Sequence, residues 1–187
     1  MIINLITLAT VKTYLGITDT DSDASITAMI PIVSSDIRRI LNANYDNYVV
    51  GSFDETSTTL YVSYEIGKYG QAIPFNPLAV GTVVYHENLP DDTYISAFTP
   101  STGNYTLSAT PDDAGTYVYP HLTISQWPTV SKMIQYRINN LNTTACDDEV
   151  KSKSMGGVSI TYKDVNSKYD YPQKYITDLG TPFARVG

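Results

Sequence analysis

The stretch Asp23–Asn42, DASITAMIPIVSSDIRRILN, decides the fold of this chain. Its apolar residues recur at the three-then-four spacing that places side chains on one face of an α-helix: Ile26, Met29, Ile30, Val33, Ile37, Ile40 and Leu41. Asp23 stands at its start and Arg38 and Arg39 stand in its last turns, which suits the helix dipole. We expect a kink near Thr27–Pro31 but no break, because the apolar stripe continues past Pro31.

A second stretch with the same period lies far along the chain, at Pro128–Thr143. Pro128 fits the first position of a helix, and Val130, Met133, Ile134, Ile138 and Leu141 form its apolar stripe. Two amphipathic helices each need a partner that covers the apolar face. We therefore expect them to pack against each other as an antiparallel pair, with Ile37 and Ile138 in the core.

A short helix is predicted at Thr7–Leu15, with Thr7 as its N-cap and Gly16–Ile17 as its C-cap. The acidic loop that follows resembles the start of a calcium-binding EF-hand. Its sixth position is Ala24 and its twelfth is Ile30, where that motif needs Gly and Glu, so we predict helix capping and no calcium site.

Residues 48–125 have a different texture, with short β-prone runs between turn residues. They contain nine of the 16 tyrosines. The predicted strands are Thr58–Tyr64, Thr82–His86, Thr93–Phe98, Tyr105–Ser108 and Thr116–Tyr119. Eight acidic residues and one lysine fall in this range, which matches the net charge of −7 of the whole chain of 187 residues. The remainder is neutral, so residues 48–125 are a compositional unit.

These patterns predict an α+β fold. We expect a helical core of two long antiparallel helices plus short helices, formed by residues 1–47 and 126–164. A β-rich acidic insertion, residues 48–125, interrupts this core, and the helices are expected to form without it. A strand over Val158–Tyr162 follows a Gly–Gly bend.

Residues 165–187 are predicted to form an extended C-terminal arm that contains a short helix or extended stretch at Tyr171–Leu179. Basic and aromatic residues alternate in the arm: Lys168, Tyr169, Tyr171, Lys174, Tyr175, Phe183 and Arg185. Interfaces favour such side chains, and the segment is too small to fold alone. We expect the arm to be ordered by docking, and its removal after Val165 to leave the fold intact.

The usual catalytic and cofactor motifs are missing, so we predict no enzyme, no cofactor and no metal site. His86 and His121 have no cysteine or second histidine at ligand spacing, and the single cysteine, Cys146, rules out an internal disulfide. No apolar run is long enough for a membrane helix, and no signal peptide is recognisable.

Two segments carry a resemblance to a known family. The opening ITLATVKTYLGITDTDSDASITAMIPIVSSDIRRIL resembles the start of the head–tail connector (adaptor) proteins of tailed bacteriophages, which have a capped short helix, an Asp-rich loop and a long helix. The segment SKSMGGVSITYKD resembles the stretch that follows their last long helix. A third stretch, Thr93–Ser108, resembles β-hairpin elements of phage virion proteins. The β-rich insertion departs from the family pattern.

The resemblance implies a structural component of the virion neck, made in the host cytoplasm. Copies of the chain, twelve in the family, would form a ring on the portal protein. The ring would extend the DNA channel without sequence-specific binding and would offer its far face to a stopper or tail-completion protein. The resemblance also implies that the arm residues named above bind the portal.

Two other functions remain open from the residues alone. One is a glycan- or surface-binding module that uses the Tyr-rich insertion, since tyrosines on half-exposed strands form recognition faces as well as ordinary sheet packing. The other is a hydrolase that uses Asp91, Asp92 or His121.

Overall fold

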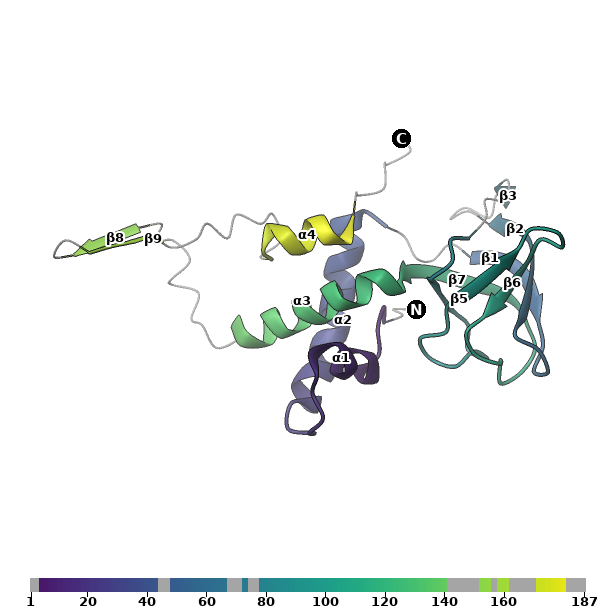
Figure 1. Cartoon of the computed structure of the whole chain (residues 1–187), viewed down its shortest axis with the longest axis horizontal. Helices are drawn as coiled ribbons and strands as arrows, with labels where there is room; N and C mark the ends of the chain where they lie inside the picture. The colour runs from purple at the N-terminus through teal and green to yellow at the C-terminus, as the bar shows by residue number, and fades with distance from the viewer. Residues whose placement is uncertain are drawn as a thin grey trace.

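The computed structural model describes residues 4–43, 48–66, 72–73, 78–140, 152–155, 158–161 and 171–180. A nearly closed β-barrel lies at one end of the long axis, and a layer of helices lies beside it (Figure 1). The helices are α1 (Leu8–Leu15), α2 (Asp23–Leu41), α3 (Trp127–Asn140) and α4 (Gln173–Leu179), and the 3-10 turn η1 (Ile124–Gln126) leads into α3.

The barrel is an antiparallel sheet with the strand order β4-β7-β1-β2-β6-β5, and β3 pairs with the end of β2. Its strands are β1 (Tyr48–Phe53), β2 (Thr59–Ile66), β3 (Ala72–Ile73), β4 (Thr82–Tyr85), β5 (Ile95–Thr99), β6 (Asn104–Leu107) and β7 (Gly115–Thr123). A bridge between Val83 and Tyr94 joins the two outer strands. Beside it, the backbone N–H of Val84 donates to Thr93 O at 2.9 Å. These bonds pair the edges that an open sheet would leave exposed.

Side chains fill the barrel interior. Val49 of β1 lies opposite Val118 of β7, and Leu60 of β2 lies opposite Tyr105 of β6. All four are almost fully buried and belong to one apolar cluster, as the alternation of a strand requires. The Tyr105 hydroxyl accepts a hydrogen bond from the backbone N–H of Leu78, so this buried phenol has a polar partner.

The helices bury a second apolar cluster. The predicted stripe of α2 is buried throughout, and α2 continues through Pro31 as one helix. Val130, Met133 and Ile134 of α3 face it, and Ile138 is half-buried at its margin. The caps of α1 are as predicted: Thr7 accepts from Thr10 N, and the N–H groups of Gly16 and Ile17 donate to the carbonyls of the last turn.

The predicted fold class is wrong. Seven strands form one barrel-like sheet, which is a major body of the molecule and not a small excursion from a helical core. The two long helices do not form an antiparallel pair, since α2 crosses α3 steeply in Figure 1. Val83 of β4 and Leu122 of β7 also belong to the helical cluster. The barrel therefore contributes side chains to the core of the helical layer.

Polar and aromatic contacts fix the barrel to the helices. Asp92, in the loop between β4 and β5, accepts hydrogen bonds from the hydroxyls of Thr7 and Thr10 at the start of α1. A carboxylate is favoured there by the dipole of the helix. Trp127, the first residue of α3, contacts Tyr14 of α1 and Tyr94 beside β5 edge to face, each at 6.3 Å between ring centroids.

The burial of α2 gives a test with two isoleucines on one helix. Ile37 is fully buried, and we expect Ile37→Ala to lower the free energy of unfolding by about 2–5 kcal/mol, because the removed atoms leave a cavity. Ile32 is 46% exposed, so Ile32→Ala is the matched control and should lower it by less than about 1 kcal/mol. Urea unfolding followed by circular dichroism measures both. Equal losses would show that the buried face of α2 is assigned wrongly.

Candidate functional site

The C-terminal residues that were expected to bind a partner lie in two settings. Tyr171 is fully buried against α2 and α3, so its side chain is not available to a partner in this structure. Tyr175 is half-buried against the same cluster, and Lys174 is exposed on α4. Four of the expected residues lie outside the described part of the chain: Lys168, Tyr169, Phe183 and Arg185.

Tyr171 belongs to a hydrogen-bonded network centred on the carboxylate of Asp36, whose side chain is 12% exposed. The Tyr171 hydroxyl donates to Asp36 Oδ2 at 2.7 Å. Arg137 Nη2 donates to the same oxygen at 3.0 Å, and Arg137 Nε donates to the Tyr171 hydroxyl at 3.0 Å. Arg39 Nη2 binds the other oxygen, Oδ1, at 3.0 Å. Burial raises the pKa of Tyr171 well above its usual value, so the phenol stays protonated and keeps donating.

This network attaches the C-terminal segment to the helical layer. The guanidinium of Arg137 also lies over the Tyr171 ring, 4.7 Å from its centroid. At the far end of α4, Gln126 Nε2 donates to the backbone carbonyl of Leu179, which is itself buried. Residues 171–180 are thus part of the core. Removal of the chain after Val165 would take away this part, contrary to our expectation that the fold would survive it.

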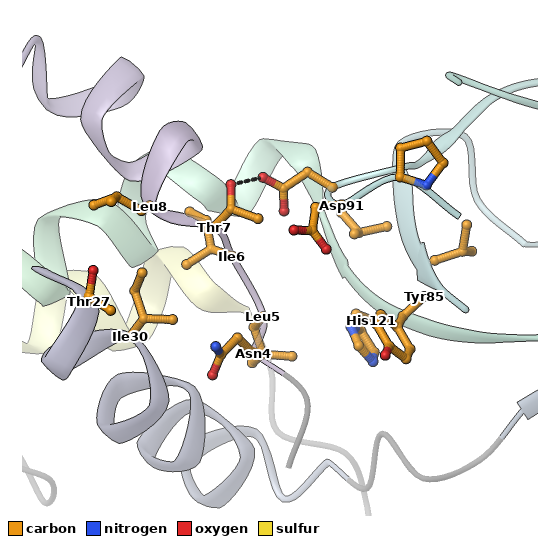
Figure 2. A pocket seen from close by; sticks show the side chains of 14 residues that line it. Asn4, Leu5, Ile6, Thr7, Leu8, Thr27, Ile30, Tyr85, Asp91 and His121 are labelled. Carbon is orange, nitrogen blue, oxygen red and sulfur yellow. Dashed lines mark hydrogen bonds between the residues drawn. The ribbon is translucent and has the colours of Figure 1, made fainter. Parts of the chain in front are cut away.

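A second feature is a cleft of about 390 Å³ between the helices and the barrel. The segment before α1 and the first half of α2 form one wall, and β4, the β4–β5 loop and β7 form the other (Figure 2). The cleft brings together the three residues of the hydrolase hypothesis: Asp91, Asp92 and His121. Figure 2 shows Asp91 between the N-terminal segment and His121, while Thr7 holds the neighbouring carboxylate of Asp92.

The chemistry of the cleft does not favour acid–base catalysis. The His121 ring stacks on Tyr85, with an angle of 7° between the planes. Burial lowers the pKa of His121 to about 4, and the positive charge of Arg38 acts in the same direction. An imidazole with this pKa is neutral but a weak base at neutral pH, since an effective general base has a pKa near the working pH. The Asp92 carboxylate is already engaged by two threonines.

Four tyrosines of the barrel gather on the outer face of β1, β4 and β7. Tyr48, Tyr117 and Tyr119 contact one another, and Tyr85 contacts Tyr119. The angles between the planes of these neighbouring rings run from 42° to 80°. Rings tilted in this way pack on one another.

The described part of the chain also bears on metal binding and on membrane insertion. No group of three or more His, Cys, Asp and Glu side chains there is arranged to hold a metal ion. No helix among those residues combines the length and the apolar character needed to cross a membrane.

Sequence reasoning missed the Asp36 network. The signal was present, because Asp36 lies beside the apolar stripe of α2, one residue before the buried Ile37. An acidic residue at such a position needs partners from another element. Arg137 on the second predicted helix and Tyr171 in the arm were the groups that could supply them.

Removal of the Tyr171 hydroxyl oxygen, which donates to Asp36, is expected to lower the free energy of unfolding measurably. We expect Tyr171→Phe to lower the free energy of unfolding by about 1–3 kcal/mol, because it leaves a buried carboxylate with one donor fewer. Tyr175→Phe, on α4 but without a hydrogen bond to Asp36, is the matched control and should have little effect. The measurement is urea unfolding, and equal values for the two variants would contradict a stabilising role for the network.

Because the pKa of His121 is lowered in the native protein, we expect the free energy of unfolding to depend on pH. Its pKa is about 4 in the native protein and near 6.5 in an unfolded chain. Above the unfolded value both states are neutral, so the group adds no pH dependence. As the pH falls from the unfolded value towards the native one, only the unfolded chain takes up a proton, and the free energy of unfolding drops by up to roughly 3 kcal/mol.

The variant His121→Gln removes this titration. We expect the loss of stability between about pH 7 and about pH 5 to be smaller in the variant than in the parent protein. Urea unfolding at both pH values measures it. An unchanged pH dependence would show that other groups carry it.

No protein-family model, curated protein or solved structure matches this chain. Its function is therefore inferred from its own residues, from the geometry above and from the resemblance stated at the outset.

Proposed function

We propose that this protein is a structural component of a bacteriophage neck, a ring of identical copies that binds the portal protein. In this role it extends the DNA channel and offers a docking face to a stopper or tail-completion protein. DNA passes through without sequence-specific contacts. The proposal assigns the chain no catalytic activity, no cofactor and no place in a membrane.

The single observation that carries the proposal is the hairpin β8–β9. Its strands, β8 (Ser152–Met155) and β9 (Val158–Thr161), fall within the segment SKSMGGVSITYKD that resembles the connector family. The two strands pair with each other as a separate sheet, and the hairpin stands clear of the helices and the barrel in Figure 1. A lone two-stranded hairpin is marginally stable in water. A neighbouring subunit or the portal would supply the surface that it lacks.

The amino-terminal elements support the same assignment. The capped helix α1, the acidic loop and the long helix α2 follow one another in the order seen in the connector family. Lys12 holds this arrangement, since its Nζ binds Asp23 Oδ1 at 2.6 Å and also contacts Asp19 O in the loop. A rigid helical layer joined to a closed barrel suits a structural subunit.

A reconstitution experiment tests the ring. We expect the purified protein, mixed with the portal of the same phage, to form ring particles of uniform diameter on the portal by electron microscopy. Alone in solution it is expected to be monomeric, with the portal acting as the template. The control is the portal of an unrelated phage. A protein that stays monomeric and unbound beside its own portal would contradict the proposal.

The arm is tested separately from the fold. Because residues 171–180 are part of the core, the informative truncation is after Gly180, which removes Phe183 and Arg185 but keeps the Asp36 network. We expect this variant to keep the parent's unfolding midpoint and to bind the portal more weakly in a pull-down. Lys174→Glu, on the exposed face of α4, should weaken binding more at low salt than at high salt. Unchanged binding by both variants would place the portal contact elsewhere.

A further inference from the structure

The cleft between the helices and the barrel has a chemistry that points to a particular occupant. Its apolar wall includes Leu5, Ile30 and Val83, and the stacked pair of Tyr85 and His121 forms part of the other side. Its volume of about 390 Å³ lies within the range of roughly 300–1,000 Å³ that is typical of ligand pockets. The space therefore suits one or two side chains that have long apolar stems.

The charges of the cleft are acidic. Asp91 and Asp92 belong to the lining, and none of the described residues that line the cleft is a lysine or an arginine. The Asp92 carboxylate is held by Thr7 and Thr10, whereas Asp91 is exposed and its carboxylate has no hydrogen bond or ion pair with the residues that the structure describes. Besides burial, the positive charge of Arg38, which is not among the lining residues, lowers the pKa of His121. A long side chain that ends in a cation, lysine or arginine, would lay its stem on the apolar wall and its charge at Asp91.

The chain itself carries such side chains in a segment that follows α3 in the sequence. From Val150 onward the sequence has six bases against three acids, and four of the lysines lie within residues 151–168: Lys151, Lys153, Lys163 and Lys168. Figure 1 places the β8–β9 hairpin of this segment at the opposite end of the long axis from the barrel. The β8–β9 hairpin of one copy therefore lies away from its own cleft and is available to another copy.

We propose that the cleft receives lysine side chains from residues 151–168 of a second copy of this chain. The proposal rests on the proposed ring and names the contact between its subunits. Such a contact joins two different surfaces, so it is head-to-tail, and repeated head-to-tail contacts close into a ring when the rotation between copies allows it. The acidic barrel and the basic segment are complementary in charge, which favours this pairing over barrel with barrel.

A peptide experiment tests the contact without the portal. A fluorescent peptide of residues 151–168 is titrated with the full chain and followed by anisotropy. We expect saturable binding that weakens with salt, about tenfold weaker binding to Asp91→Asn, and unchanged binding to Asp112→Asn. Asp112 is the matched control, because it is an exposed barrel carboxylate outside the cleft lining. A peptide with its four lysines changed to glutamine should lose binding.

Three results would overturn the proposal: no binding of the peptide to the parent protein, equal binding to Asp91→Asn and the parent, or equal binding of the glutamine peptide. Thermal melts of both variants check that the fold is kept. If the peptide does not bind, the contact between copies is wrong, but ring formation on the portal is not contradicted. If the peptide binds and no rings form on the portal, the proposed function is contradicted and the contact is not.

A cross-linking experiment separates contact between copies from contact within one copy. Light and heavy-isotope chains are mixed at high protein concentration, where a weak contact between otherwise monomeric copies forms, and are treated with a carbodiimide, which joins a lysine directly to a carboxylate. We expect cross-links between Asp91 and residues 151–168 that combine a light with a heavy peptide. Cross-links confined to light–light and heavy–heavy pairs would show that each copy fills its own cleft, which would contradict the proposal.

Discussion

The carboxylate of Asp36 holds together three parts of the helical layer. Its donors come from α2 itself, from α3 and from the segment before α4, through Arg39, Arg137 and Tyr171. A carboxylate at this depth is tolerable only with partners of good geometry, and removal of one partner leaves charge that neither water nor protein satisfies. Because each donor is carried by a different segment, the network also sets how these segments lie relative to one another. The covering of the apolar face of α2 by α3 and α4 depends on that arrangement.

The barrel and the helices share an apolar surface and several polar contacts. Val83 and Leu122 belong to the helical cluster, while Val84 and Val118 belong to the cluster in the barrel interior. The strands β4 and β7 thus supply side chains to two apolar clusters. Asp92 adds a polar contact between the barrel and the helices, since its carboxylate, in a barrel loop, accepts hydrogen bonds at the first turn of α1. A substitution in β4 or β7 therefore acts on both clusters.

The sequence predicted local elements well, because local patterns determine them. The stripe of α2, the caps of α1 and five of the strands of the barrel follow from periodicity and turn residues over a few positions. Strand β1 was missed because its apolar residues are interrupted by Gly51, which sits at a bulge in the pairing with β2. The topology failed for a different reason. The pairing of Val49 with Val118 joins residues far apart in the chain, and no local pattern names such a partner.

For the candidate site, too, the sequence shows local patterns but not the contacts between segments that lie far apart in the chain. The alternation of bases and aromatics drew attention to the arm as an interface, but it could not tell that the Tyr171 side chain is buried. Asp36 with Arg39 three residues later reads as an ordinary surface pair on one helix, and only the fold brings Arg137 and Tyr171 to it. The cleft was likewise beyond sequence reasoning, since its walls come from segments before α1, within α2 and within the barrel.

The separation of 135 residues between Asp36 and Tyr171 bears on how the protein is made. A ribosome releases α1 and α2 first, yet α3 and α4, which cover part of the apolar face of α2, emerge only after the barrel strands have been synthesised. Until then that part of the face is exposed to water and to other nascent chains. Final packing therefore has to wait until translation is nearly complete, and an incomplete chain that stops before Tyr171 cannot close its core.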